Sequence, residues 1–223
     1  MIRRADNGAV TLMAHGFEPP ANSLVLNKGD VAWTETVSPV HLVRTTDPRP
    51  QRKRPNTSAI DAGTVLFGMS IQSGMAYCPP IDYQANTSRV QCLQDLDNDG
   101  TFDAAYVTKQ YSLDTQFLSV WVHELAGLNN KVGYEPVQDA SEGPTGQIEL
   151  RFDGVRKSKP SFRLYVENER IDDRIYCRPL TDTTCAMMGV RLTYSMVDKK
   201  TMEITSMALA DNRVFSVRSE YNG

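Results

Sequence analysis

The stretch "GQIELRFDGV", residues 146–155, decides the fold class of this chain. Its apolar side chains at Ile148, Leu150 and Phe152 alternate with polar or charged neighbours. A period of two is typical of a β-strand that packs one face on a core and turns the other to water. We therefore predict a strand here, in a sheet with one wet face.

The same alternation continues towards the C-terminus. It is present in "PSFRLYVENE" (160–169), "GVRLTYSMV" (189–197), "TMEITSMAL" (201–209) and "RVFSVRSEY" (213–221). The predicted inner faces carry Phe162, Leu164 and Val166, then Val190, Leu192, Tyr194 and Met196, then Met202, Ile204 and Ser206. The short link "VDKKTM" (197–202) between two such runs predicts a hairpin. Residues 147–223 are therefore expected to form an antiparallel meander.

The first part of the chain, residues 1–136, is also rich in strand signals but is less regular. Its β-like segments are 22–36, 38–46, 63–71, 87–95, 102–110 and 117–125, separated by Pro, Gly, Asn and Asp. The 12 prolines and 14 glycines imply many turns. Together these features predict an all-β, mainly antiparallel fold, a sandwich or a barrel-like arrangement. The polar segment 136–146 is either a linker between two domains or a long loop within one continuous domain.

Composition excludes some classes of protein. The 223 residues are 40% hydrophobic, enough for one large domain or two small ones. No apolar run approaches the roughly 18 to 20 residues of a membrane-spanning helix, so we expect no transmembrane segment. The net charge of −3 gives no long-range attraction to nucleic acid or acidic membranes, and a partner of that kind would need a local basic patch.

The four cysteines fall into two local pairs, Cys78 with Cys92 and Cys177 with Cys185. Each pair brackets a polar, turn-rich segment, which favours two structural disulfides over free thiols. A zinc site is disfavoured because neither pair has the gap of about two to four residues found in zinc knuckles, and His15, His41 and His123 are distant in sequence. Disulfides predict an oxidising compartment, so we expect a secreted or periplasmic protein whose signal peptide has been removed.

The segment "CLQDLDNDGTFDAAYV" (92–107) contains the pattern D-x-D-x-D-G-x-x-D. Alternate carboxylates followed by a glycine can surround a calcium ion, which takes six to eight oxygen ligands. Four carboxylates within nine residues also repel one another, and no lysine or arginine lies between Asp95 and Asp103 to relieve that repulsion. The alternative is an exposed polar turn whose carboxylates are kept apart by water.

In these residues the segment resembles the calcium loops of integrin-type FG-GAP repeats and, less closely, those of dockerins and EF-hands. The likeness to FG-GAP loops is closer because Asp103 takes the ninth position and "AAYV" continues as a strand, whereas an EF-hand would have glutamate where Tyr106 stands. The resemblance implies a structural calcium held by Asp95, Asp97, Asp99, the Thr101 carbonyl and Asp103. Without the twelfth-position glutamate, we expect an affinity of roughly 10⁻⁴ to 10⁻³ M.

The segment "RTTDPRPQRKRP", from Arg44 to Pro55, is basic and rich in proline. It is either a solvated loop or a contact for an anionic glycan, a lipid head group or an envelope protein. Nucleic acid is not the expected partner because no aromatic residue is interleaved with the charges.

Catalytic motifs are incomplete. "HELAG" (123–127) lacks the second histidine of H-E-x-x-H, and "GMSIQ" (68–72) lacks the last glycine of G-x-S-x-G. The leading hypothesis is thus an exported, calcium-stabilised, non-catalytic β protein with a binding or structural role in the cell envelope or outside it. The alternative is an exported hydrolase or glycan-active enzyme with a site assembled from scattered residues, with candidates His41, His123, Glu167, Glu169, Asp172 and Asp173. Trp33, Trp121 and Tyr106 are expected in the core or on a sheet surface.

Overall fold

The computed structural model describes residues 8–50, 59–71, 73–80, 89–109, 121–156, 159–166, 169–209 and 213–218. In these ranges every element is a β-strand except the short 3-10 turn Ala140–Glu142, and every strand pair with a described register is antiparallel. The predicted all-β class is confirmed. Across the described residues, no helix has the length and apolar character needed to span a membrane.

The chain folds as two compact units. Unit 1 contains the described residues of Met1–Leu12, Ser38–Thr145 and Ser216–Gly223, and unit 2 those of Met13–Val37 and Gly146–Phe215. The chain passes between them along β1 (Ala9–His15), β3 (Val31–Pro39) and β17 (Val214–Arg218), and in the link after β9.

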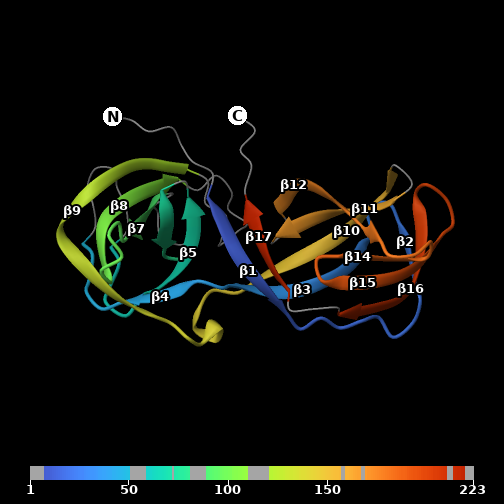
Figure 1. Cartoon of the computed structure of the whole chain (residues 1–223), viewed down its shortest axis with the longest axis horizontal. Helices are drawn as coiled ribbons and strands as arrows, with labels where there is room; N and C mark the ends of the chain where they lie inside the picture. The colour runs from blue at the N-terminus through green and yellow to red at the C-terminus, as the bar shows by residue number, and fades with distance from the viewer. Residues whose placement is uncertain are drawn as a thin grey trace. The chain divides into compact units, whose positions relative to one another are not determined.

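Unit 1 is a closed ring of six strands (Figure 1). They are β4 (Leu42–Thr45), β5 (Val65–Ile71), β6 (Gly74–Cys78), β7 (Arg89–Gln94), β8 (Thr101–Lys109) and β9 (Trp121–Pro136). Following the pairings from β4 through β9, β8, β7 and β6 leads to β5, which pairs β4 again. The barrel-like arrangement expected from the sequence is therefore present in this unit.

The ring closes because its strands bend around an apolar centre. The register of β8 against β9 shifts twice, between Phe102 and Ala104 and between Tyr106 and Thr108, and such bulges curl a sheet. The side chains packed inside are Val43, Ile60, Leu66, Leu93, Phe102, Ala105 and Val132, flanked by Tyr77, Leu128 and Tyr134.

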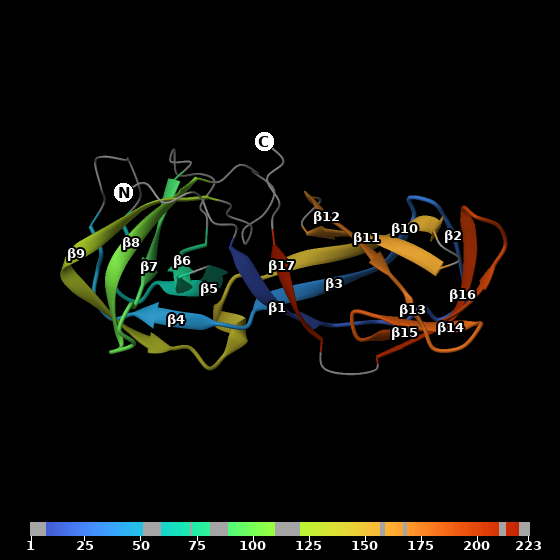
Figure 2. The same ribbon diagram turned by 45° about the horizontal axis from the view of Figure 1, so that its top comes forward.

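Unit 2 contains two antiparallel sheets (Figure 2). The first joins β3 to β10 (Gly146–Arg156), β11 (Lys159–Val166) and β12 (Glu169–Tyr176). The second has the order β13 (Arg178–Pro179), β14 (Thr184–Met187), β15 (Val190–Met196), β16 (Thr201–Leu209) and β2 (Leu24–Asn27).

The alternation in residues 146–155 is observed in β10. Ile148, Leu150 and Phe152 are at most 1% exposed, and they pair with Val166, Leu164 and Phe162 of β11. Burying each such side chain contributes on the order of 1.5 to 3 kcal/mol. This row of apolar pairs anchors the first sheet of unit 2.

Two side chains that the alternation placed on inner faces need a correction. Met196, at the end of β15, is 37% exposed instead of buried. The strict alternation placed Ser206 beside Met202 and Ile204, but Ser206 is exposed and Met207 is buried instead. The register shifts at this point, so that Tyr194 opposes Ile204 while Leu192 opposes Met207. A bulge of one residue exchanges the two faces of the strand beyond it. The hairpin predicted at 197–202 is present, with turn 197–200.

The two units do not follow a single cut in the sequence. The change from unit 1 to unit 2 after Thr145 lies within the polar segment 136–146. Residues 13–37, however, belong to unit 2, because β2 pairs β16 and β3 pairs β10. Unit 2 is therefore completed by an early part of the chain, which a division into 1–136 and 147–223 does not contain.

Candidate metal centre

The aspartate loop, residues 95–100, links β7 to β8 in unit 1. Two of its residues have left-handed backbone, Asn98 with φ 59° and Gly100 with φ 88°. Asn and Gly are the residues that adopt this conformation most readily. The sequence "DLDNDG" therefore folds locally as a tight turn, after which β8 begins at Thr101.

Asp95 organises the turn by accepting hydrogen bonds. Its Oδ1 accepts from the backbone N–H of Asn98 (2.7 Å) and Asp99 (3.3 Å), and its Oδ2 accepts from the N–H of Gly100 (3.0 Å). The Tyr134 hydroxyl of β9 also donates to Oδ2, at 2.9 Å. Partial burial by itself raises the pKa of Asp95, but these four donors outweigh it and the pKa is lowered. Asp95 is therefore a carboxylate at neutral pH.

Lys131 of β9 lies among the other three carboxylates. Its Nζ is 2.7 Å from Asp99 Oδ2, 2.7 Å from Asp103 Oδ1 and 3.5 Å from Asp97 Oδ2. The segment 95–103 itself contains no basic residue, as its sequence shows. The fold nevertheless brings Lys131 among the carboxylates, so the expectation that no basic residue relieves their repulsion is wrong. A lysine about 30 residues away supplies one positive charge.

The ion pairs shift the titration of these groups. Hydrogen bonds from Lys131 and Thr101 lower the pKa of Asp99 to about 2. Hydrogen bonds from Lys131 and the Leu96 N–H lower the pKa of Asp103. The same contacts with Asp103 and Asp99 raise the pKa of Lys131, so its ammonium stays protonated.

The cluster keeps a large excess of negative charge. The carboxylates of Asp95, Asp97 and Asp99 each place one oxygen within 4.8 Å of the others, in an exposed group that could hold a metal ion. With Asp103 there are four carboxylates against one ammonium, which leaves a net charge of −3. Thr101 also contributes two donors to the cluster, because its N–H and Oγ1 both donate to Asp99 Oδ1 (2.8 and 2.6 Å). Its carbonyl stays the predicted ligand.

Two disulfides lie where the cysteine pairs predicted them. Cys78 of β6 bonds Cys92 of β7 in unit 1, and Cys177 bonds Cys185 of β14 in unit 2. All four cysteines are at most 1% exposed. The disulfides indicate an oxidising, extracytoplasmic environment.

The basic segment is only partly described. Arg44 lies on β4 and forms ion pairs with Glu142 and Glu135, the latter at 3.8 Å. Arg52, Lys53 and Arg54 lie outside the described residues. Arg44 is therefore held by unit 1 itself, and the description gives no support to an anion contact at this segment.

The residues of the enzyme alternative do not assemble into a described site. His41 is exposed in the link between β3 and β4, and His15 is exposed at the end of β1. His123 lies on β9, and Glu169, Asp172 and Asp173 on β12, but their side chains are outside the description, as is the whole of Glu167. Trp33 and Tyr106 are buried, as expected, while the side chain of Trp121 is outside the description.

Sequence reasoning missed two residues of the cluster, Lys131 and Tyr134. Both lie on β9, where residues 132 and 133 pair with 102 and 101 of β8. No local signal marks them, because their place beside the loop depends on the pairing of two distant strands.

In comparisons with known proteins, no family model, no curated protein and no solved structure matches this chain.

Proposed function

We propose that this chain is an exported, non-catalytic β protein, stabilised by calcium at the aspartate loop, with a binding or structural role in the cell envelope or outside it. The observation that carries the proposal is the aspartate cluster itself. Its three ligand oxygens lie within 4.8 Å of one another, and the cluster retains a net charge of −3 after Lys131 is counted. The likeness of its sequence pattern to FG-GAP loops supports calcium as the ion.

The chemistry of the donors fits calcium better than a transition metal. All four side chains offer carboxylate oxygens, which calcium prefers, and the cluster has no imidazole or thiolate among its described donors. The ammonium of Lys131 competes for Asp99 and Asp103, so an arriving ion displaces it. This competition lowers the affinity and matches a site that works at extracellular calcium concentrations of roughly 10⁻³ M.

The role of the ion would be structural. The loop joins β7 to β8, and Lys131 and Tyr134 tie the loop to β9. A divalent ion at this point would hold three neighbouring strands of the ring together, next to the disulfide that links β6 and β7. Export is supported by the two disulfides, which persist in oxidising compartments.

Thermal unfolding with chelator and with graded calcium tests the ion. An ion that binds only the folded state raises stability by RT ln(1 + [L]/Kd). We expect the melting temperature of the parent to rise with calcium and that of Asp97→Asn, Asp99→Asn to stay constant. Lys131→Met removes the competing ammonium and should respond at lower calcium than the parent.

A matched control removes two carboxylates from unit 2. Asp182→Asn, Asp198→Asn loses the same charge and should keep the calcium response of the parent. A melting temperature of the parent that does not change with calcium would refute the site, and so would an equal rise in all four proteins.

Export is tested separately by producing the chain in the cytoplasm and in the periplasm of a bacterium. Alkylation followed by mass measurement should find no free thiols in the periplasmic protein. If the cytoplasmic protein is reduced, thermal unfolding should give it a lower melting temperature than the periplasmic protein. A reduced protein as stable as the oxidised one would remove the argument for an oxidising compartment.

A further inference from the structure

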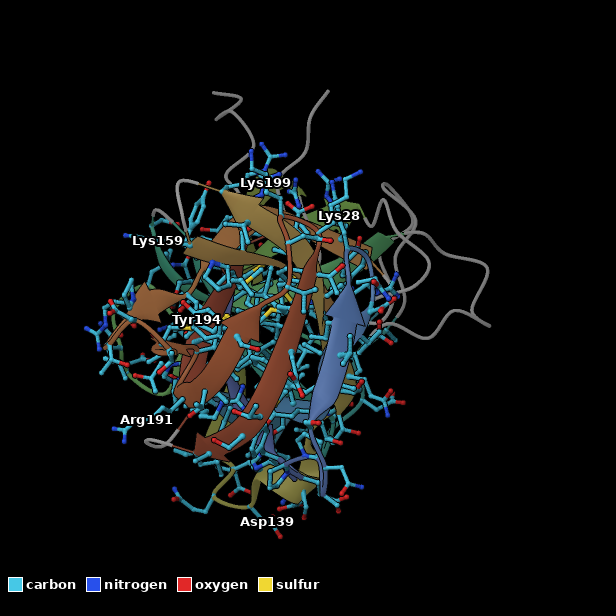
Figure 3. The ribbon with its side chains drawn as sticks, turned by 90° about the vertical axis from the view of Figure 1, so that its right-hand side faces the viewer. Lys28, Asp139, Lys159, Arg191, Tyr194 and Lys199 are labelled. Carbon is cyan, nitrogen blue, oxygen red and sulfur yellow. A yellow bond between two sulfur atoms is a disulfide. The ribbon has the colours of Figure 1, made fainter. Side chains whose placement is uncertain are left out.

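Three segments of unit 2 meet at one end of the unit. The backbone N–H of Lys28, after β2, donates to the carbonyl of Lys200 (2.8 Å), in the β15–β16 turn. The N–H of Val155, at the end of β10, donates to the carbonyl of Lys199 (3.0 Å). Segments far apart in the sequence therefore share one surface, and Figure 3 shows Lys28, Lys159 and Lys199 at this end with Arg191 at the other.

This surface is rich in exposed cations. We define the basic end as Lys28, Arg156, Lys159, Lys199 and Lys200, all of which are exposed. The whole chain has a net charge of −3. The positive charge is thus concentrated locally on a protein that is acidic overall, and such a separation orients the molecule in the field of an anionic partner.

The nearby carboxylates are engaged by other donors. Asp198 Oδ1 accepts the backbone N–H of Lys200 (2.6 Å), and Asp30 Oδ2 accepts the N–H of Asn27 (2.7 Å). Asp153 lies 2.5 Å from Arg174 but 3.8 Å from Lys28. The five cations of the basic end and these three carboxylates together carry a net charge of +2, before Arg174 and Arg163, the other partners of Asp153, are counted.

The same end exposes apolar side chains. Val197 is 65% exposed and Met196 is 37% exposed. Met196 ends β15, and Val197 begins the turn that carries Lys199 and Lys200. Lysines beside exposed apolar side chains suit a partner with an anionic surface and an apolar interior. A lipid bilayer has both, whereas a soluble anionic glycan or nucleic acid offers charge alone.

We propose that the basic end of unit 2 docks on anionic lipid head groups, with Val197 entering the head-group layer. The inference rests on the proposed role in the cell envelope for its biological setting, and it does not depend on calcium. The partner is a membrane surface containing anionic lipids, bound reversibly and in a salt-dependent way.

Flotation of the full oxidised chain with vesicles, in chelator, tests the proposal. We expect binding to vesicles of phosphatidylcholine mixed with phosphatidylglycerol, none to phosphatidylcholine alone, and loss of binding as salt is raised. Each cation near an anionic membrane contributes about fivefold in affinity, so Lys199→Glu, Lys200→Glu should bind at least about 25-fold more weakly. Val197→Ser should bind a few-fold more weakly than the parent.

The control is Arg170→Glu, Arg191→Glu, which reverses two exposed charges away from the basic end. Arg170 opposes Tyr165, far along β11 from Lys159, and Figure 3 shows Arg191 away from Lys28 and Lys199. It should bind like the parent, and circular dichroism with melting confirms that each variant is folded. No binding to anionic vesicles at low salt would overturn the proposal, as would equal losses in both charge reversals. Heparin or single-stranded DNA that binds as tightly as the vesicles, with no effect of Val197→Ser, would replace the membrane by a soluble polyanion. None of these results changes with the outcome of the calcium or thiol experiments.

Discussion

Each unit contains one charge cluster, and the two clusters have opposite compositions. In unit 1, one ammonium, Lys131, lies among the carboxylates of the aspartate loop. In unit 2, one carboxylate, Asp153, lies among three cations, with Arg174 at 2.5 Å, Arg163 at 3.4 Å and Lys28 at 3.8 Å. In each cluster, a single side chain carries the charge opposite to that of its neighbours: Lys131 in unit 1 and Asp153 in unit 2.

The clusters differ in their exposure to solvent. The side chain of Lys131 is 46% exposed, and that of Asp153 is 11% exposed. Water and salt screen the first cluster and screen the second much less. The exposed cluster can therefore exchange its counter-ion at small cost, whereas the central group of the shielded cluster is a fixed part of the sheet. A loop suits the first task and a strand suits the second.

The disulfides provide the largest test of this comparison. In the loop-entropy model, Cys78→Ser, Cys92→Ser should cost about 3 kcal/mol, and Cys177→Ser, Cys185→Ser about 2.5 kcal/mol. The first is larger because its cysteines are 14 residues apart and the second pair only 8. Urea unfolding of both variants measures the difference. A costlier loss in unit 2 would show that native contacts outweigh loop length.

A pair of glycines with nearly the same backbone gives the next effect. Gly154 has φ 90° and Gly100 has φ 88°. A Cβ on Gly154 would lie 2.9 Å from the Lys199 carbonyl oxygen, whereas a Cβ on Gly100 would meet nothing within 4 Å. Gly154→Ala should therefore cost about 2 to 3 kcal/mol, from strain and overlap, and Gly100→Ala about 1 kcal/mol. Equal melting temperatures for the two variants would contradict this reading of the β15–β16 turn.

Asp153→Asn tests the shielded cluster directly. Burial raises the pKa of Asp153, but the hydrogen bond from Arg174 and the nearby cations outweigh it, and the pKa is lowered. Replacing the carboxylate leaves three cations without their central counter-charge and should cost about 2 kcal/mol in urea unfolding. Glu149→Gln is the matched control, because Glu149 pairs only with Arg151 in the described contacts and is more exposed. A cost no greater than that of the control would mean that the cluster is screened after all.

The smallest effect is the acid dependence of the aspartate loop. The pKa of Asp99 is lowered to about 2 in the fold, against about 3.9 in an unfolded chain. The folded state thus binds fewer protons, so this stability is fully present above about pH 4 and is lost as the pH falls towards 2. Lys131→Met removes the main cause of the shift. Its urea midpoint should fall less steeply with acid than that of the parent, and parallel curves would contradict the ion pair.

Much of the fold was predictable because strand signals are local. Alternation at Ile148, Leu150 and Phe152 depends only on the period of the backbone, and the structure buries all three. The cysteine pairs were predictable for the same reason, since the two cysteines of each disulfide are close in the sequence and are joined by one short segment. The turn at residues 95–100 followed from Asn98 and Gly100, which tolerate left-handed backbone.

The failures share one cause, which is distance along the chain. A one-residue bulge turned Ser206 outward, and nothing in the local alternation announces a bulge. The joining of residues 13–37 to unit 2 required β2 to find β16. A pattern of period two predicts that a strand exists, but it does not predict which other strand it will pair with.

The sequence by itself determined the β class of this protein, its two disulfides and the position of its acidic turn, because each is set by residues within one strand or one turn. Only the tertiary structure decided that the ring closes through β5, that Lys131 enters the acidic turn and that five cations meet at one end of unit 2. These depend on which edges of distant strands meet. That choice is made by the packing of the whole core, which minimises exposed apolar surface and unpaired backbone groups together.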